Sequence, residues 1–255
     1  MSLWQICNGE QFITYLEGEM YRMVESQEQV ATMSYVDSLQ EQAVLETLLE
    51  SAKPSYPDAI ISASMGSELH YLLKTPFRYP PLPWGSRFGR THEPSLFYGG
   101  KTLQATLSES AYYRFVFLHS MEGEPPKASL RTEHTLFSAG YRSNRGIKLQ
   151  ERPFFDYKMQ LSHMNNYDIS QALGSEMRAC GVQVFEYFSA RSKNDEVCVA
   201  LFTPEAFADA KPSAVEAWFC ELTSDQVSFK PQRSNMTYSF GLAQFLVDDR
   251  LPMPA

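Results

Sequence analysis

The chain has 255 residues, of which 44% are hydrophobic and 20% are charged, and its formal net charge at pH 7 is −8. This composition is typical of a globular protein with one large domain, and it excludes a disordered chain. The negative charge argues against direct nucleic-acid binding, because general nucleic-acid binders neutralise phosphates with Lys and Arg. The four cysteines form no Cys-x-x-Cys pair, and no apolar stretch approaches the roughly 20 residues of a membrane span. We therefore expect a cytoplasmic protein that does not bind membranes.

Charge is distributed unevenly along the chain. Residues 1–69 carry 2 basic and 11 acidic side chains, residues 70–160 carry 13 and 7, and residues 161–255 carry 7 and 12. A basic middle segment between acidic ends indicates a cationic pocket that attracts a small anion, with the N-terminal segment as an outer or partner-facing layer. The alternative is an ordinary variation of charge along a surface.

The first third of the chain is predicted to be helical. One helix is expected over residues 15–31. A second is expected over residues 38–52, because Ser38 and Glu41 have the spacing of a capping box and apolar residues then recur on one face until Pro54.

A connection is expected next, over residues 53–65, which contain two prolines and several serines. We therefore predict an N-terminal helical extension, residues 1–65, followed by the main domain, residues 66–255. Whether the helical extension covers a pocket or mediates self-association into a homo-oligomer stays open.

The main domain is predicted to mix short strands and helices. Arg78 is expected at the end of a strand, because the prolines that follow it force an extended loop. Strands are further expected at 96–98, 134–139, 182–188, 197–202, 215–222 and 227–229, and helices at 103–118 and 167–179. These elements show no regular strand–helix–strand rhythm, which predicts an α+β fold rather than a doubly wound sheet.

Several common catalytic motifs are missing from the sequence. Gly100-Lys101-Thr102 is similar to the end of a phosphate-binding loop, but Ser95 stands where that loop requires glycine. No Gly-x-Gly-x-x-Gly follows a predicted strand, and no Gly-x-Ser-x-Gly occurs. The five histidines have no metal-ligand spacing, so we expect no metal site.

The segment from Tyr71 to Ser110 is the strongest candidate for a binding site. It contains Arg78 before a run of prolines, and Arg87 shortly after Gly85. Guanidinium groups offer planar forks of donors that match phosphate oxygens, and glycine lets a ligand approach the backbone closely. The segment therefore predicts a phosphorylated substrate.

Four short pieces of sequence occur in a characteristic order. They are Phe77-Arg78-Tyr79, Gly85-Ser86-Arg87-Phe88, Leu96-Phe97-Tyr98 with Ala105-Thr106-Leu107-Ser108-Glu109, and Tyr187-Phe188-Ser189-Ala190-Arg191. Together they resemble the RES family, named for its arginine, glutamate and serine, over about residues 70–205. The resemblance implies a fold like that of ADP-ribosyltransferases, with a mixed or antiparallel β core and flanking helices. It also implies a bacterial toxin that consumes NAD and is held in check by an Xre-type helix-turn-helix antitoxin.

The resemblance further implies roles for five residues. Glu109 would be the catalytic carboxylate, assisted by Arg78 and Tyr98. Arg78, Arg87, Tyr98 and Ser189 would line the NAD site. Breaking the bond between ribose and nicotinamide develops an oxocarbenium ion, which a fixed carboxylate stabilises. Arginine forks would neutralise the pyrophosphate of NAD. NAD is then a substrate, and no cofactor is expected.

Alternatives to these roles stay open. Without the resemblance, Glu109 is an ordinary solvated helix glutamate, Arg78 and Arg87 form structural ion pairs, and Tyr98 belongs to the core. Water, inorganic phosphate or a protein side chain could accept the ADP-ribose. The activity would then be that of an NAD glycohydrolase or phosphorylase, which depletes NAD, or of a mono-ADP-ribosyltransferase with a specific protein target. A non-catalytic binding module of the same fold is the third possibility.

Overall fold

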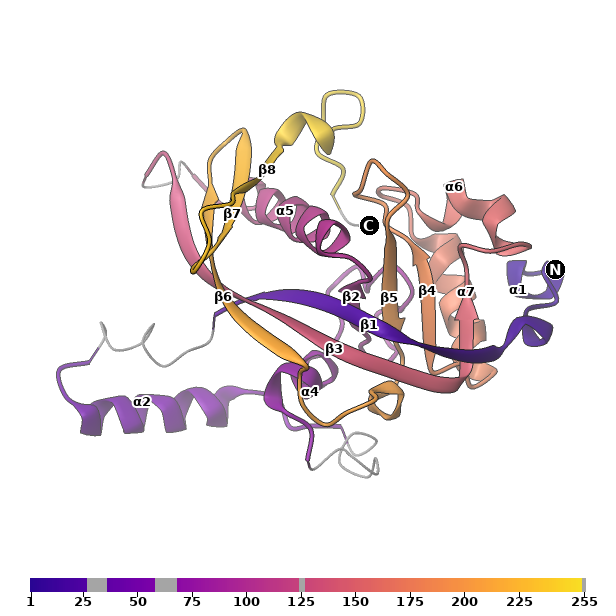
Figure 1. Ribbon diagram of the computed structural model, residues 1–255, viewed down its shortest axis with the longest axis horizontal. Helices are drawn as coiled ribbons and strands as arrows, with labels where there is room; N and C mark the ends of the chain where they lie inside the picture. Colours follow the sequence, from indigo (N-terminus) through magenta and orange to yellow (C-terminus); the bar gives the residue numbers. More distant parts are fainter. Residues whose placement is uncertain (27–35, 58–67, 124–126, 254–255) are drawn as a thin grey trace.

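The computed structural model of the chain describes residues 1–26, 36–57, 68–123 and 127–253. Its centre is an eight-stranded sheet with the strand order β1-β2-β5-β4-β3-β6-β7-β8, in which β1 also pairs with β3 (Figure 1). The strands are β1 (Thr14–Glu25), β2 (Phe97–Gly100), β3 (Leu130–Lys148), β4 (Val184–Phe188), β5 (Val197–Leu201), β6 (Ala214–Leu222), β7 (Gln226–Pro231) and β8 (Tyr238–Gly241). The β3–β4 pair is parallel and the other pairs are antiparallel, so the sheet is mixed. The predicted α+β class is confirmed.

The helices lie around this sheet. They are α1 (Leu3–Ile6), α2 (Leu39–Ala52), α4 (Tyr71–Arg78), α5 (Leu103–His119), α6 (Lys158–Leu161) and α7 (Asp168–Ala179). Short 3₁₀ helices cover Gly9–Phe12, Phe154–Tyr157, Pro204–Ala206 and Leu242–Gln244. Within the described residues, no helix combines the length and the apolar character that a membrane crossing needs.

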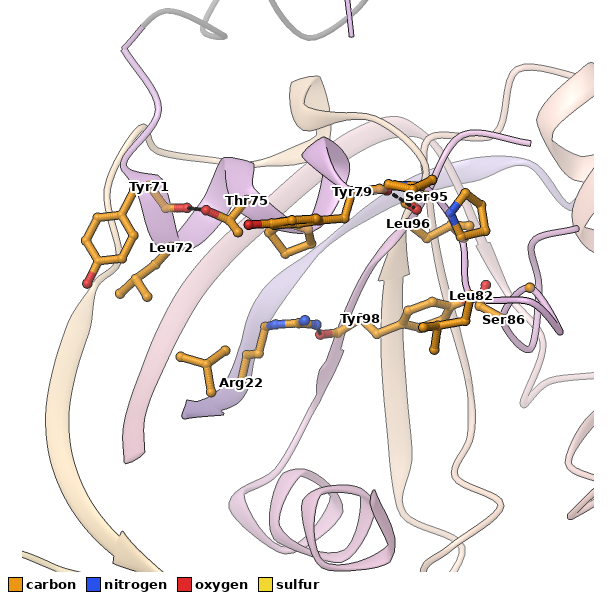
Figure 2. A pocket seen from close by; sticks show the side chains of 15 residues that line it. Arg22, Tyr71, Leu72, Thr75, Tyr79, Leu82, Ser86, Ser95, Leu96 and Tyr98 are labelled. Carbon is orange, nitrogen blue, oxygen red and sulfur yellow. Dashed lines mark hydrogen bonds between the residues drawn. The ribbon is translucent and has the colours of Figure 1, made fainter. Parts of the chain in front are cut away.

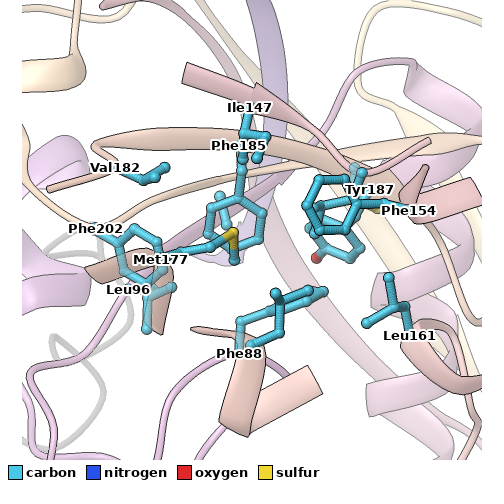
Figure 3. Packing of buried hydrophobic residues seen from close by; sticks show 14 of the residues in the cluster. Phe88, Leu96, Ile147, Phe154, Leu161, Met177, Val182, Phe185, Tyr187 and Phe202 are labelled. Atoms are coloured by element: carbon cyan, nitrogen blue, oxygen red, sulfur yellow. The ribbon is translucent and has the colours of Figure 1, made fainter. Parts of the chain in front are cut away.

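Three buried apolar clusters join the helices to the sheet. The first contains Met177 of α7 and Phe185 of β4, together with Phe88 from the loop before β2 (Figure 3). In the second, α4 packs against β1, β2 and β5. In the third, α5 packs against β6, β7 and β8. Alternate side chains of β5 enter the first and second clusters, so both faces of this central strand are buried.

The first predicted helix, over residues 15–31, is wrong. The described part of that range forms the long strand β1, which pairs with β3 from Thr14 to Glu25. The apolar residues Leu16, Met20 and Val24 recur every four positions, which is close to one helical turn and is also two strand repeats. The spacing therefore fits both structures, and the pairing with β3 decides between them. Residues 27–31 lie outside the described residues.

The strand end expected at Arg78 is also wrong, because Arg78 is the last residue of helix α4. The helix begins at Tyr71, where the His70 side chain accepts a hydrogen bond from the N–H of Leu72. Leu72, Leu73 and Phe77 are buried and share one face, so tertiary packing favours the helix despite the internal Pro76. A loop follows it as predicted, and it contains two tight turns, with isolated bridges between Leu82 and Gly85 and between Ser86 and Gly89.

The predicted helix over residues 38–52 is confirmed as α2, and the Ser38 side chain accepts a hydrogen bond from the N–H of Glu41 at its start. Its expected apolar face does not pack on the sheet. Figure 1 shows α2 projecting from the body, and Leu39, Val44 and Leu48 are exposed. The predicted division between residues 65 and 66 falls within 58–67, which lie outside the described residues.

The other predicted helices and strands agree well with the structure, whereas α1, α6 and β8 were not predicted. Helices α5 and α7 lie within a residue or two of their expected bounds, and β2, β4, β5, β6 and β7 are present at the predicted positions. The strand expected at 134–139 is the middle of the much longer β3. This strand pairs with β1, β4 and β6, and it therefore holds the N-terminal strand and the C-terminal strands in one sheet.

Candidate active site

A cavity of about 470 Å³ opens where β1 and β2 diverge. The two strands pair only at Tyr21 and Gly100 among the described residues, so the ends of β1 and β2 beyond this pair are free to part. Helix α5 and the loop that precedes β2 complete the walls. A volume of this size is within the range of small-molecule sites.

Glu109 of α5 lines this cavity and is half-buried. The Ser189 hydroxyl donates a hydrogen bond to Oε1 of Glu109 at 2.5 Å. The backbone N–H groups of Arg191 and Ser192 donate to Oγ of Ser189 at 3.1 and 3.2 Å. Because these bonds occupy the acceptor side of the hydroxyl, its hydrogen is directed at the carboxylate. Ser189 therefore fixes the orientation of Glu109, and it does so from behind, since it does not itself line the cavity.

Tyr98 of β2 lines the same cavity and joins β2 to the preceding loop. Its hydroxyl accepts a hydrogen bond from the N–H of Phe88 at 3.1 Å and lies 2.9 Å from Oγ of Ser86. Burial raises the pKa of Tyr98 to about 12, so the hydroxyl stays neutral at physiological pH. With the hydroxyl committed to the loop, the ring is the part of Tyr98 that a ligand can contact.

Arg87 also lines the cavity, and it has a structural role as well. Its Nη1 donates to the carbonyl of His163 at 2.6 Å, and its guanidinium lies 4.6 Å from the ring centre of Tyr167. Helix α7 presses on the loop that carries it: a Cβ at Gly174 would lie 2.0 Å from the carbonyl oxygen of Phe88. This close approach is open only to glycine, and it holds Arg87 at the cavity wall.

Arg78, like Ser189, does not line the cavity, and unlike Ser189 it has no described contact with Glu109. It lies at the end of α4, where its Nη1 pairs with Oε1 of Glu50 on α2 at 2.7 Å. Its guanidinium also lies 4.6 Å from the ring centre of Tyr56 and donates to the carbonyl of Pro54. These contacts connect α4 to α2, so the structure gives Arg78 the ion-pair role that the sequence left open.

Arg22 of β1 occupies the cavity instead, and the sequence analysis missed it. Its Nη1 donates to the carbonyl of Tyr98 at 2.5 Å, and its guanidinium lies 4.9 Å from the ring centre of Phe97. Burial lowers the pKa of Arg22 to about 10, which still leaves the side chain charged at neutral pH. A single arginine within the apolar run Met20-Tyr21-Arg22-Met23-Val24 was the available signal, because a charge inside a buried strand needs a reason.

Two further side chains extend the site along α5. Tyr113 lies one helical turn beyond Glu109 and lines the cavity. Arg114 follows it and pairs with Glu25 of β1 at 3.0 Å, which ties the helix to the first strand. The charged groups facing the cavity are thus three arginines and two glutamates (Arg22, Arg87, Arg114, Glu25 and Glu109), in keeping with the predicted cationic pocket. Among the described residues, no group of three or more His, Cys, Asp or Glu side chains lies close enough to hold a metal ion.

A comparison with protein families identifies the family of the chain. The model of the RES domain matches residues 62–223, and the chain therefore belongs to the RES family. The matched range contains Arg87, Tyr98, Glu109 and Ser189, whereas β1 with Arg22 lies before it. A comparison with curated proteins finds no match.

Proposed function

We propose that the protein is an NAD-consuming enzyme that breaks the bond between nicotinamide and ribose. The observation that carries this proposal is the Glu109 carboxylate, which Ser189 orients in a cavity that Arg22 and Arg87 also line. Membership of the RES family, which is associated with NAD and with toxin–antitoxin systems, supports it.

The chemistry assigned to Glu109 is electrostatic. When the C1′–N bond breaks, its electron pair leaves with nicotinamide, which departs as a neutral molecule, and the ribose develops oxocarbenium character. A carboxylate fixed beside C1′ stabilises this cation, as in glycoside hydrolysis. An oxygen of phosphate or water then bonds to C1′, and the proton of that nucleophile passes to solvent.

The arginines supply the binding energy for the dinucleotide. Arg22 is charged and has one hydrogen bond to a backbone carbonyl among its described contacts, so several of its five donors remain for a ligand. A guanidinium in a partly buried cleft attracts phosphate more strongly than one in open water, because the local dielectric is lower. We assign the pyrophosphate of NAD to Arg22, with Arg87 as the second cation.

Phosphorolysis or hydrolysis would deplete the NAD pool, and this outcome fits a toxin. An Xre-type helix-turn-helix protein is the proposed antitoxin. Mono-ADP-ribosylation of a protein target uses the same bond cleavage, and it differs only in the acceptor of the ribosyl cation.

The experiment is incubation of the purified protein with NAD, with and without inorganic phosphate, followed by chromatography of nicotinamide and the ribosyl products. We expect nicotinamide release, and ADP-ribose or its 1″-phosphate as the product. Glu109→Gln is expected to lower turnover by about 10²–10³-fold. Glu19→Gln, on an exposed position of β1, is the matched control.

The outcomes separate the alternatives. A cell extract is incubated with the protein and with NAD that is labelled in its ADP-ribose part. Transfer of the label to a protein, without free ADP-ribose or its phosphate, favours the transferase. A folded wild type that releases no nicotinamide under any of these conditions contradicts catalysis and favours a binding module.

A further inference from the structure

A second cavity, of about 380 Å³, lies next to the active-site cavity. It is formed by α4, by the loop after it and by the side of Arg22 and Tyr98 that faces α4 (Figure 2). Five residues line both cavities, namely Arg22, Leu82, Gly85, Ser86 and Tyr98. The two cavities therefore share a wall, and the Arg22 guanidinium is the charged group in it.

The second cavity differs from the first in its chemistry. Apart from Arg22, none of its described lining residues is charged. Tyr71 and Tyr79 are 45% and 40% exposed, and prolines lie between Tyr79 and Leu82. Flat, partly exposed aromatic and apolar groups of this kind form stacking surfaces for a planar, uncharged ring.

Two hydroxyl groups fix the walls of this cavity. Thr75 donates to the carbonyl of Tyr71 at 2.6 Å, and Ser95 donates to the carbonyl of Tyr79 at 2.7 Å. Each hydroxyl oxygen keeps lone pairs that can accept a hydrogen bond from a ligand amine. The cavity thus combines stacking surfaces with acceptors.

We propose that this second cavity binds the adenine of NAD. The inference rests on the proposed function, and it assigns the order of the ligand along the protein: nicotinamide riboside beside Glu109, pyrophosphate at Arg22, and adenine between Tyr79 and α4. NAD has two bases joined through a charged pyrophosphate, and the two cavities meet at a guanidinium in the same order. The enzyme therefore selects the dinucleotide over nicotinamide mononucleotide (NMN), which lacks the adenosine half.

The test compares NAD with NMN in the wild type and in two variants. Tyr79→Ala removes a stacking surface, and Thr75→Trp fills the cavity. Each is expected to lower the ratio of kcat/KM for NAD to kcat/KM for NMN by about ten-fold. Turnover of NMN by the same sample reports whether the variant is folded. Tyr15→Ala, at a tyrosine that is 50% exposed on β1 outside both cavities, is the matched control and leaves the ratio unchanged.

Binding of AMP, measured by calorimetry, does not depend on turnover. AMP is expected to bind to the wild type and to Glu109→Gln, and to lose binding in Thr75→Trp. An unchanged NAD-to-NMN ratio in both variants, or an equal loss for both substrates, overturns the assignment. A wild type that cleaves neither substrate overturns the proposed function, and AMP binding then decides the adenine assignment by itself: retention of AMP binding in Thr75→Trp refutes it.

Discussion

The two walls of the active-site cavity are built differently. On the α5 side, the N–H groups of Arg191 and Ser192 hold Ser189, and Ser189 holds Glu109, so the carboxylate has one orientation. On the β1 side, Arg22 spans the gap between two diverging strands with a single described hydrogen bond, to the carbonyl of Tyr98. In the first wall a chain of hydrogen bonds ends on Oε1 of Glu109, and the second wall leaves most donors of Arg22 for a ligand.

This difference suggests that the Glu109 wall serves catalysis and the Arg22 wall serves substrate binding. A group that stabilises a short-lived cation gains from a fixed position, because it needs no reorganisation at the moment of reaction. A group that binds a flexible pyrophosphate gains from free donors. We therefore expect substitutions on the Glu109 wall to lower kcat, and substitutions on the Arg22 wall to raise KM as well.

After Glu109→Gln, the largest loss of activity is expected for Arg22→Gln. Loss of the cation removes the main partner assigned to the pyrophosphate, and we expect kcat/KM for NAD to fall by about 10²-fold. Arg22→Lys keeps the charge but lacks the planar fork of donors. Its kcat/KM is expected to lie between those of the wild type and Arg22→Gln. Steady-state kinetics with NAD measures all three, and thermal denaturation checks that the variants are folded.

Arg78→Gln is the matched substitution at the arginine that the sequence motif indicated. It breaks the ion pair with Glu50, which is a partly exposed contact, and kcat/KM is expected to stay within about two-fold of the wild type. If kcat/KM falls as much in Arg78→Gln as in Arg22→Gln, the different roles assigned to the two walls are wrong.

The free energy of unfolding is expected to depend on pH through His134 of β3, which also lines the cavity. Burial, and then the nearby Arg114 cation, lower the pKa of His134 from 6.5 to about 4. The unfolded chain takes up a proton below pH 6.5 and the folded chain only near pH 4, so the free energy of unfolding falls as the pH falls through this window. The expected loss is about 3 kcal/mol.

Urea denaturation of the wild type and of His134→Gln at several pH values measures this contribution. Carboxylates titrate in the lower part of the same window, but they do so in both proteins. The difference between the two pH profiles therefore isolates the histidine. Parallel profiles contradict the prediction.

A smaller effect is expected for Ser189→Ala. The substitution removes a hydrogen bond to a charged group, worth about 1.5–3 kcal/mol, so kcat is expected to fall by about ten-fold or more with little change in KM. Ser192→Ala is the control, because its side chain accepts from the N–H of Asn194 and has no described contact with Glu109. A change in KM alone contradicts the positioning role.

The contrast between the walls also explains what the sequence could predict. Helix α5 was predicted with Glu109 on it, because apolar residues that recur on one helical face are a local signal. Strand β1 was mistaken for a helix, because the spacing of Leu16, Met20 and Val24 fits both periods. Its partner β3 lies more than 100 residues away along the chain, and no local pattern records that pairing. Arg22 was missed for this reason, while the likeness of the core to ADP-ribosyltransferases stays a prediction.

The last prediction concerns the loop that carries Arg87. In Gly174→Ala, the new Cβ would lie 2.0 Å from the carbonyl oxygen of Phe88, and a backbone atom cannot move aside by changing rotamer. We expect a loss of stability of about 1–3 kcal/mol, with a lower melting temperature, and weaker NAD binding because the loop shifts Arg87. Gly241→Ala is the control, since the nearest atom to its Cβ is 4.0 Å away and its φ of −79° suits any residue. That substitution is expected to be neutral or to stabilise the fold by about 0.4–1 kcal/mol. Equal stabilities of the two variants would mean that α7 does not press on the Arg87 loop, and that Arg87 is held by the carbonyls of Leu161 and His163 and the ring of Tyr167.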